Sequence, residues 1–323
     1  MSNKHQKIHF INIALMLLSG FFAFFLPFEL FIFAYAILGP LHYLTEISWL
    51  HDRNYFTKKP YDVFFLLLPV VPSYICLILK IDLNDHWHHL GLATALIFSA
   101  LGVFVSDRLW RFCIFATSLN ILVLVYFSLP AFFIIFFLFL TTIIHVYVFT
   151  GLFILFGALK EESRVGLLSL LIYLVIPCIF LLYVPDSSLY QTSFYFLDAA
   201  SGFSEVQMHL KNIFFTNNNW DTTVATMRFI AYAYTYHYLN WFSKTKVIKW
   251  HEVGYKRFGV ILFAYILSVS AYLIDYQFGL IVLFLLSLFH VILEFPLNFR
   301  SIEGVLSEIK KGTLMRILKA KSI

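Results

Sequence analysis

Charged residues are scarce in this chain of 323 residues, since Asp, Glu, Lys and Arg together make up only 13% of it. Water-soluble domains carry about a quarter of their residues as these types, so a soluble enzyme or binding module is excluded. Apolar residues account for 61% and aromatic residues for 20%, and the mean hydropathy is +0.82. The composition therefore predicts an all-α, polytopic integral membrane protein lying in a lipid bilayer.

Cysteine is equally rare. Cys76, Cys113 and Cys178 lie in three different apolar segments, and no pair has the spacing of a zinc ribbon or a redox motif. We interpret all three as packing residues. The formal net charge is +5, but the basic residues flank apolar segments and do not form a surface interleaved with aromatics. We therefore expect no nucleic-acid partner.

No polar stretch is long enough to form a separate soluble domain, so residues 1–323 are predicted to form one transmembrane domain. The segment 185–222 is polar and aromatic and is expected on the outer surface, and residues 300–323 are expected to form a cytoplasmic tail. Ten transmembrane helices are predicted, at about 10–26, 28–47, 62–80, 88–106, 109–128, 130–156, 165–184, 223–243, 257–275 and 277–299.

The basic residues indicate the direction of these helices. With ten spans, 20 of the 23 Lys and Arg residues fall on one side, and only Lys80, Lys211 and Arg228 fall on the other. Loops rich in Lys and Arg stay in the cytoplasm, so both termini are predicted to be cytoplasmic.

Four histidines lie inside separate apolar segments, namely His42, His145, His237 and His290. Their predicted helices all run from outside to inside, and each histidine precedes the next basic boundary by 7 to 15 residues. A rise of about 1.5 Å per residue places the four rings roughly 10 to 22 Å from that boundary. Because an imidazole is costly in hydrocarbon, four at one depth indicate a shared metal ion.

Two acids accompany these histidines, since Glu46 follows His42 and Glu294 follows His290 by four residues. Side chains at this spacing project from one face of a helix. We expect both carboxylates to orient the imidazoles or to neutralise metal charge without binding the ion directly. Fe(II), Zn(II) and Cu all suit imidazole ligands, and ligand type alone leaves the choice open. The structural alternative is that each histidine holds a neighbouring helix by a hydrogen bond.

Aromatic side chains near the histidines would exclude water and accept a hydrophobic substrate. For any single aromatic the alternative is ordinary packing, because the chain contains 39 phenylalanines. The predicted substrate-lining residues are Tyr147, Phe149, Tyr234, Tyr236, Trp241 and Phe289.

Four short elements resemble motifs of the Brp/Blh family of bacterial membrane β-carotene 15,15′-dioxygenases, in the same order along the chain. The order and hydropathy match most of the chain, while the residue identity is confined to these elements. The family's third element has a second histidine four residues on, where this chain has Trp241. The matching residues are Gly39, Pro40, Leu41, His42 and Glu46, then Ile143, Ile144 and His145, then Tyr236 and His237, and finally His290, Leu293, Glu294, Phe295 and Arg300.

The resemblance implies an iron enzyme of the bacterial inner membrane that takes a carotenoid from the lipid and cleaves its central double bond with O₂ to give retinal. It implies that Fe(II) is bound by the four histidines and that Glu46 and Glu294 orient these ligands. It implies no catalytic residue beyond the metal centre.

Three other functions are compatible with the same residues. Membrane histidines also bind haem in electron-transfer proteins, although two haems usually need ligand pairs at two depths. Histidines and acids at depth build the proton relays of transporters. A non-catalytic metal- or lipid-binding subunit of a larger membrane complex would retain the fold without activity. The segment from Asp85 to His89 is interpreted as an interfacial belt, with metal binding as its alternative.

Overall fold

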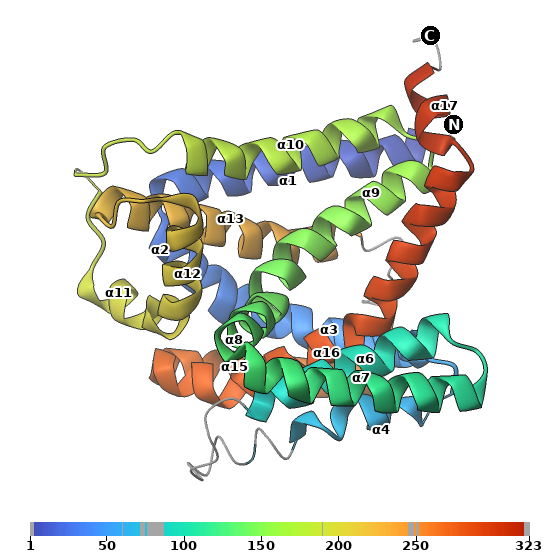
Figure 1. Ribbon diagram of the computed structural model, residues 1–323. Helices are drawn as coiled ribbons and strands as arrows, with labels where there is room; N and C mark the ends of the chain where they lie inside the picture. The colour runs from blue at the N-terminus through green and yellow to red at the C-terminus, as the bar shows by residue number, and fades with distance from the viewer. Residues whose placement is uncertain are drawn as a thin grey trace.

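The computed structural model describes residues 3–59, 61–71, 75, 87–188, 190–244, 249 and 252–319. Within these ranges the regular elements are all helical and no strand is present, which confirms the all-α prediction (Figure 1). The helices are α1 (Asn3–Phe25), α2 (Pro27–Phe33), η1 (Ala34–Leu38), α3 (Gly39–Asp52), η2 (Asn54–Phe56), α4 (Asp62–Leu67), α6 (Trp87–Phe104), α7 (Arg108–Ser128), α8 (Pro130–Phe139), η3 (Leu140–Phe149), α9 (Thr150–Lys160), α10 (Arg164–Leu182), α11 (Phe194–Ala200), η4 (Ser201–Phe203), α12 (Ser204–Phe214), α13 (Trp220–Ser243), α15 (Tyr255–Ile274), α16 (Tyr276–Lys310) and α17 (Thr313–Lys319).

Seven helical segments of the described chain are long and apolar enough to cross a membrane. Three predicted spans are not among them. The span 62–80 is described only in part, beginning with α4, and Cys76 lies outside the described residues. α6 has a shorter apolar stretch, His89–Phe104, and α13 is long but rich in Tyr and Thr. The seven are Gln6–Phe25, Pro27–Asp52, Arg108–Ser128, Pro130–Lys160, Arg164–Leu182, Tyr255–Ile274 and Tyr276–Lys310.

Local sequence explains where several of these helices begin. Pro27 and Pro130 occupy the first turns of α2 and α8, where a missing N–H costs nothing. The Ser163 hydroxyl accepts a hydrogen bond from the backbone of α10. At the start of α13, the side chains of Asn219 and Thr222 cap each other's backbone N–H groups. The breaks predicted at Pro27 and Pro130 are therefore real helix boundaries, with almost no loop between the spans.

Two segments have π-helical hydrogen bonding, and both lie beside a membrane histidine. η1 ends four residues before His42, and η3 contains His145. Bonds from residue i to i+5 widen a helix locally and shift the direction of the side chains that follow, and such segments recur at functional sites. The sequence periodicity gave no indication of either segment.

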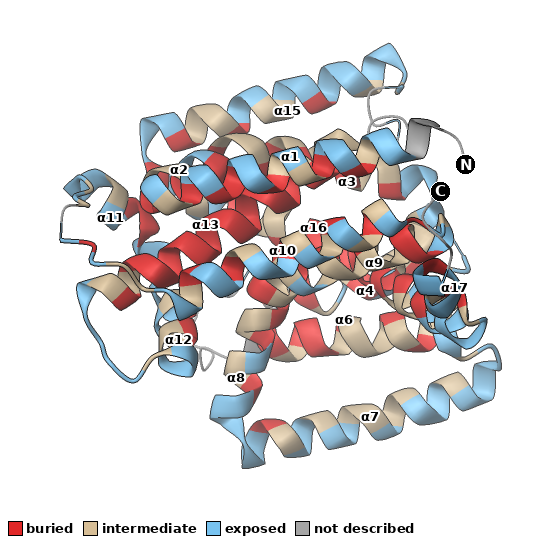
Figure 2. Cartoon of the chain, turned by 90° about the horizontal axis from the view of Figure 1, so that it is seen from above, coloured by how far each residue is buried: buried red, intermediate tan, exposed pale blue. Residues whose placement is uncertain are grey.

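Helix α13 forms the centre of the bundle. Every residue from 224 to 238 is buried, so the helix is covered on all its faces (Figure 2). It packs against α1 and α10 on one side and contacts α3 and η3 on the other. α16 in turn packs on α3, α6 and α9, so that α3, η3, α13 and α16 meet in the interior (Figure 1).

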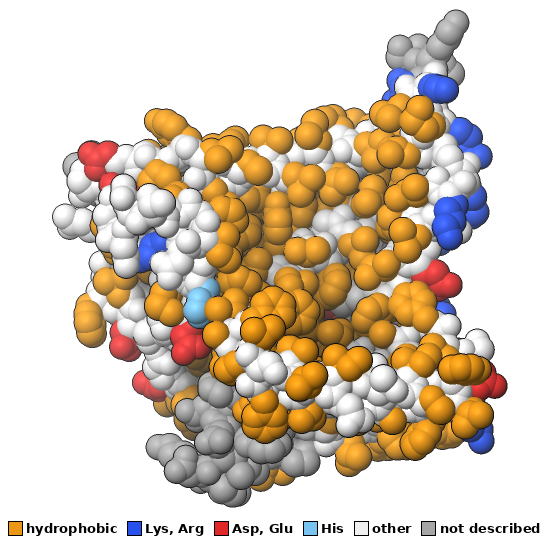
Figure 3. Space-filling model, viewed as in Figure 1, with side chains coloured by type: hydrophobic (Ala, Val, Ile, Leu, Met, Phe, Trp, Pro, Cys, Tyr) orange, Lys and Arg blue, Asp and Glu red, His pale blue; other side chains and the backbone are white. Residues whose placement is uncertain are grey.

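The two chain termini lie at the same end of the bundle, here called the terminal end (Figure 1). Most of the Lys and Arg side chains visible in Figure 3 gather at this end. The segment 185–222 forms α11, η4 and α12 at the opposite end (Figure 1). This separation follows the charge asymmetry of the sequence.

The region predicted as a tail differs from the expectation. α16 continues to Lys310 instead of ending near residue 299, and α17 follows it. Arg164 donates hydrogen bonds to the backbone carbonyls of Ile317 and Leu318, and Ile317 is buried. These contacts hold the end of the chain on the bundle, because they satisfy carbonyls at the terminus of α17.

The outer helices present apolar side chains to their surroundings. On α7, the residues Leu109, Trp110, Phe112 and Phe127 are each at least 66% exposed. The face drawn in Figure 3 is largely apolar and is hollowed near its middle. A continuous apolar surface of this kind would drive aggregation in water, so it indicates a protein covered by lipid.

Candidate metal centre

The four histidines predicted to share one depth converge in the interior. His42 Nε2 lies 3.0 Å from His237 Nε2, and His145 Nε2 lies 3.0 Å from His290 Nε2. One ligand atom from each ring falls within 4.8 Å of all the others, and all four residues are buried. The arrangement is a group of four nitrogens that could hold one metal ion.

Two of the distances between these nitrogens can be compared with those in a coordination sphere. Metal–nitrogen bonds of about 2.1 Å place two ligands about 3.0 Å apart when the bonds are perpendicular, and about 3.4 Å apart in a tetrahedron. The contacts from His42 to His237 and from His145 to His290 both have the shorter value. Perpendicular ligands belong to square-planar and octahedral ions, and 3.0 Å is also the length of a hydrogen bond between two imidazoles, so both contacts fit either arrangement.

Four helices hold these rings in place. α3, α13 and α16 carry His42, His237 and His290, and the π-helical segment η3 carries His145. Because α13 is covered over residues 224–238, its histidine is buried and lies among the other three rings. The wide turn of η3 directs His145 toward these rings. Thr150, the residue that follows η3, lies beside His237.

The second nitrogens of two rings lie beside side chains from other helices. His237 Nδ1 is hydrogen-bonded to the hydroxyl of Thr150 at 2.8 Å. His145 Nδ1 faces Glu294 Oε2 at 3.2 Å. The hydrogen bond from Thr150 fixes the orientation of the His237 ring, whereas His145 Nδ1 and Glu294 Oε2 are close together without forming a hydrogen bond. Glu294 thus lies beside His145, on another helix, while the sequence suggested His290 of its own helix, and Thr150 was not predicted.

Glu46 occupies a different position. Its Oε2 atom lies 3.0 Å from His42 Nε2, the nitrogen that faces the other histidines, and the Glu46 side chain is almost fully buried. The carboxylate therefore stands on the metal side of the ring, where it can reach the same ion. Its predicted role was to orient His42 or to neutralise metal charge without binding the ion directly, and the structure places it close enough to do the latter.

The two carboxylates also suit the charge of a divalent ion. Glu46 and Glu294 are close enough to interact electrostatically, and Lys244 interacts with Glu294. Neither Glu46 Oε2 nor Glu294 Oε2 has a hydrogen-bond donor among the described residues. Buried carboxylates without donors are costly in an apolar interior, and two ionised carboxylates balance the charge of a divalent cation. The residues present therefore fit a metal ion.

Trp241 stands where the resembled family has a histidine. Its ring lies edge-on to His42, with 5.4 Å between the centroids, and its indole N–H donates to the Thr45 hydroxyl at 3.0 Å. Trp241 therefore packs the wall behind His42, and His290 takes the fourth position of the nitrogen group.

A cavity of about 140 Å³ adjoins the centre. It touches His145 and His290, and it follows α16 as far as Leu280, which is ten residues from His290 and hence about 15 Å away along the helix axis. Leu, Val and Phe side chains form much of its wall, together with several tyrosines and His89. Its lining also includes Gly202 and Phe203 of η4 and Val206 of α12.

The structure places the predicted lining residues as follows. Tyr234 lines the cavity. The other five are not among the residues around it. Tyr147 and Tyr236 pack against Tyr173, and Trp241 lies beside His42. Phe149 joins an apolar cluster around Ile292, and Phe289 is partly exposed on α16.

Of the segment predicted as an interfacial belt, only His89 has a described side chain. It is buried and lines the cavity, while Asp85 and His86 lie outside the described residues. His9 pairs with Glu161 at 2.9 Å, away from the four-histidine group. The cavity position of His89 was missed because its neighbours in sequence are polar.

No protein-family model, curated protein or solved structure matches the chain. The fold and the site define a helical membrane-type protein with a buried group of four histidines that could hold a metal ion.

Proposed function

We propose that this chain is a membrane-embedded non-haem iron oxygenase that cleaves a carotenoid with O₂. The observation that carries the proposal is the convergence of four buried histidines, with one ligand atom of each within 4.8 Å of all the others, beside a largely apolar cavity. Four neutral nitrogens with open positions suit Fe(II) in a site that must admit O₂. The resemblance of the four histidine elements supports the same substrate class.

In the proposed reaction the carbon–carbon double bond breaks and each carbon receives one oxygen atom of O₂, which gives two aldehydes. Cleavage of the central bond of β-carotene gives two molecules of retinal. This stoichiometry requires neither protons nor an external reductant. Bound iron would supply the activation of O₂.

The side chains of the protein would position the metal ion and the substrate. The four histidines would hold the ion, Thr150 fixes the ring of His237, and Glu46 and Glu294, which lie beside His42 and His145, would balance its charge. The cavity would align the polyene along α16 and keep water from the reacting bond, which is how enclosed sites favour one reaction course.

Haem binding is less compatible with the geometry. Two axial ligands lie on opposite faces of a haem, and the porphyrin fills the plane between them. Here two further imidazoles occupy that space, since all four ligand atoms lie within 4.8 Å of one another. A single ion fits this arrangement better than a macrocycle.

The proposed topology has ten spans with both termini in the cytoplasm of a bacterium and the protein in its inner membrane. Support comes from the basic terminal end and from the extension of α11 and α12 at the opposite end (Figures 1 and 3). The number of spans would rise from the seven apolar helices to ten if three further segments also cross the membrane, namely α6, α13 and the segment that begins with α4.

The experiment that tests the proposal is expression in β-carotene-producing cells without oxygen, followed by exposure to O₂ and chromatography of the products. The expected result is retinal from the wild-type protein and none from His145→Ala. Purification under reducing, anaerobic conditions should give about one iron per chain. Iron-free protein with intact carotenoid would instead support the non-catalytic membrane subunit.

A further inference from the structure

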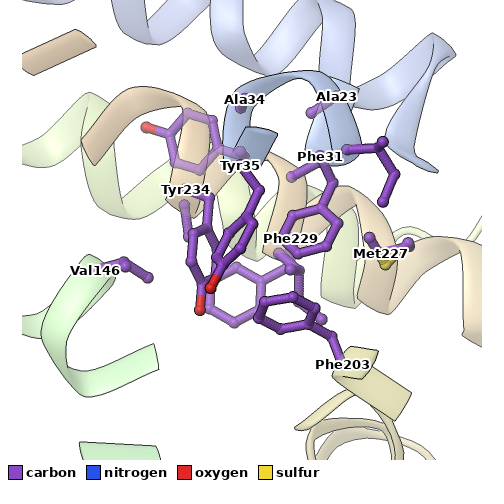
Figure 4. Close-up of a cluster of buried hydrophobic side chains, with 14 of the residues drawn as sticks. Ala23, Phe31, Ala34, Tyr35, Val146, Phe203, Met227, Phe229 and Tyr234 are labelled. Atoms are coloured by element: carbon purple, nitrogen blue, oxygen red, sulfur yellow. The ribbon is translucent and has the colours of Figure 1, made fainter. Parts of the chain in front are cut away.

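Hydroxyl groups are concentrated in the cavity next to the histidines. Tyr35, Tyr43, Tyr234, Tyr238 and Ser287 all contribute to its wall. The hydroxyls of Tyr43 and Tyr238 are hydrogen-bonded to each other at 2.8 Å. Figure 4 shows the rings of Tyr35 and Tyr234 side by side with their hydroxyls pointing in the same direction. The wall thus combines an apolar lining with a cluster of donors and acceptors.

This cluster directly adjoins the candidate metal centre. The ring of Tyr43 is stacked on His290, with 4.2 Å between centroids, and Tyr238 follows His237 in sequence. Tyr43 also interacts with Ser287 and Tyr35. The hydroxyls therefore run from the histidines into the cavity, on the path that a substrate would occupy.

The backbone makes room for the tyrosine pair. A Cβ atom at Gly39 would lie 3.0 Å from the Tyr43 hydroxyl oxygen and 3.3 Å from that of Tyr238. Both distances are too short for an ordinary contact, so any larger residue at position 39 would displace the hydroxyls. Gly39 lies inside a helix, where glycine is unfavourable relative to alanine by about 1 kcal/mol. The missing side chain at Gly39 leaves room for the hydroxyls of Tyr43 and Tyr238, which offsets this cost.

A pure hydrocarbon ligand cannot form hydrogen bonds with this cluster of hydroxyls. Each hydroxyl can donate one hydrogen bond and accept two, so the bonds among the tyrosines leave capacity for a further oxygen atom. Burying hydroxyls costs free energy unless they are hydrogen-bonded, and a site built for a polar group discriminates strongly against a ligand that lacks it. A hydrocarbon guest would cover these groups without bonding to them.

We propose that the cavity binds an oxygen-bearing polyene, with its hydroxyl or carbonyl group hydrogen-bonded to the Tyr43–Tyr238 pair. The inference rests on the proposed oxygenase function, because it names the substrate of the same site. An oxygenated carotenoid is then preferred to β-carotene, the parent hydrocarbon. Because Tyr43 is stacked on His290, an end group held by this pair places a double bond near that end of the polyene, and not the central one, at the histidines.

The test measures binding apart from cleavage. Purified full-length protein in detergent, kept free of O₂, is titrated with β-carotene and with its dihydroxylated counterpart zeaxanthin, and binding is followed by quenching of tryptophan fluorescence. We expect zeaxanthin to bind at least about tenfold more tightly, which corresponds to about 1.4 kcal/mol. Equal affinity for the two probes in the wild-type protein overturns the proposal.

Two variants assign the preference to the hydroxyls. Tyr238→Phe and the double variant Tyr43→Phe/Tyr238→Phe should bind the two carotenoids equally, with unchanged iron content. Tyr232→Phe is the matched control, because Tyr232 is a buried tyrosine of the same helix that does not line the cavity. A preference that survives in both Tyr238 variants contradicts the assignment, and the single variant serves if the double variant does not fold.

The outcomes separate the two proposals. Selective binding of zeaxanthin without any cleavage after addition of O₂ would reject the oxygenase and keep the binding site. Cleavage of β-carotene with no selectivity would keep the oxygenase and reject the role of the tyrosine hydroxyls.

Discussion

At the scale of single residues, the four histidines should act as one binding unit. Replacement of any one of His42, His145, His237 or His290 by alanine removes a quarter of the nitrogen group. We expect the iron content to fall well below one per chain, as measured by elemental analysis of anaerobically purified protein. His209→Ala is the control, since His209 lies on α12 near Phe139. Unchanged iron in any two of the four variants would show that the rings do not share an ion.

The two buried acids should differ in their effect on metal binding. Glu294→Gln keeps the shape but weakens the hold on His145, and a loss of about 10- to 100-fold in metal affinity is expected. Glu46→Gln should cost more, because it removes a negative charge beside the metal-facing nitrogen of His42. Competition with a chromophoric chelator measures both affinities.

The exposed acid Glu303, on the same helix as Glu294, provides the control, and Glu303→Gln should bind metal like the wild type. If both glutamine variants at the site keep wild-type affinity, the carboxylates serve only packing. Loss of protein yield in place of affinity would point to the same conclusion.

The histidine group was predicted correctly because each residue of a helix adds the same rise, so the depth of a side chain can be counted from the basic boundary. Counting residues to the basic boundary placed His42, His145, His237 and His290 in one layer, and the structure brings them together. The sequence could not predict that Glu294 lies beside His145. The spacing of residues along a helix shows which side chains share a face, but not which other helix packs against that face. Thr150 had no signal at all, since a threonine in an apolar helix usually bonds to its own backbone.

At the scale of elements, the π-helical segment η3 should be required for the site. Deleting Ile144 would let the segment relax to an α-helix and would turn one flank by about 100° relative to the other. His145 then leaves the group, or α8 loses its packing. We expect loss of bound iron with retained helical content, compared by circular dichroism with the control Ile144→Val. Iron binding that survives the deletion would show that η3 can be replaced by an ordinary helix.

The helices themselves were largely predictable, since hydropathy and prolines marked the boundaries of α2, α7, α8 and α10. Predicting which aromatics line the cavity was harder. Tyr234 was found, while Tyr35, Tyr43 and Tyr238 were not, because a tyrosine that faces a cavity has the same sequence signal as one that packs in the core. η1 and η3 also redirect the faces of α3 and α9, which a fixed period of 3.6 residues does not follow.

At the scale of the whole molecule, metal binding should stabilise the bundle. The ion contacts four helices and binds only when they are assembled, so free metal at 100 times its Kd adds about 2.7 kcal/mol to the free energy of unfolding. Thermal unfolding in detergent, followed by tryptophan fluorescence, should show a higher Tm with Fe(II) than after treatment with a chelator. The variant with alanine at all four histidines should unfold at the same temperature in both conditions.

The proposed topology makes a separate prediction. Reporter domains that are active only in the cytoplasm should be active when fused before residue 1 or after residue 323, and inactive when inserted between α11 and α12. Activity at one terminus alone would mean an odd number of spans and would also break the common orientation of the four histidine helices.

Helix α13 has a consequence for how the protein is made. It is covered by other helices over residues 224–238 and carries tyrosines, threonines and a buried arginine, Arg228, where other spans carry leucine and phenylalanine. Such a segment partitions poorly into lipid alone. In the proposed topology of ten spans, α13 would therefore enter the bilayer against α1 and α10, which emerge from the ribosome before it and pack against it in the structure. The helix that carries His237 would then be inserted only after these neighbours.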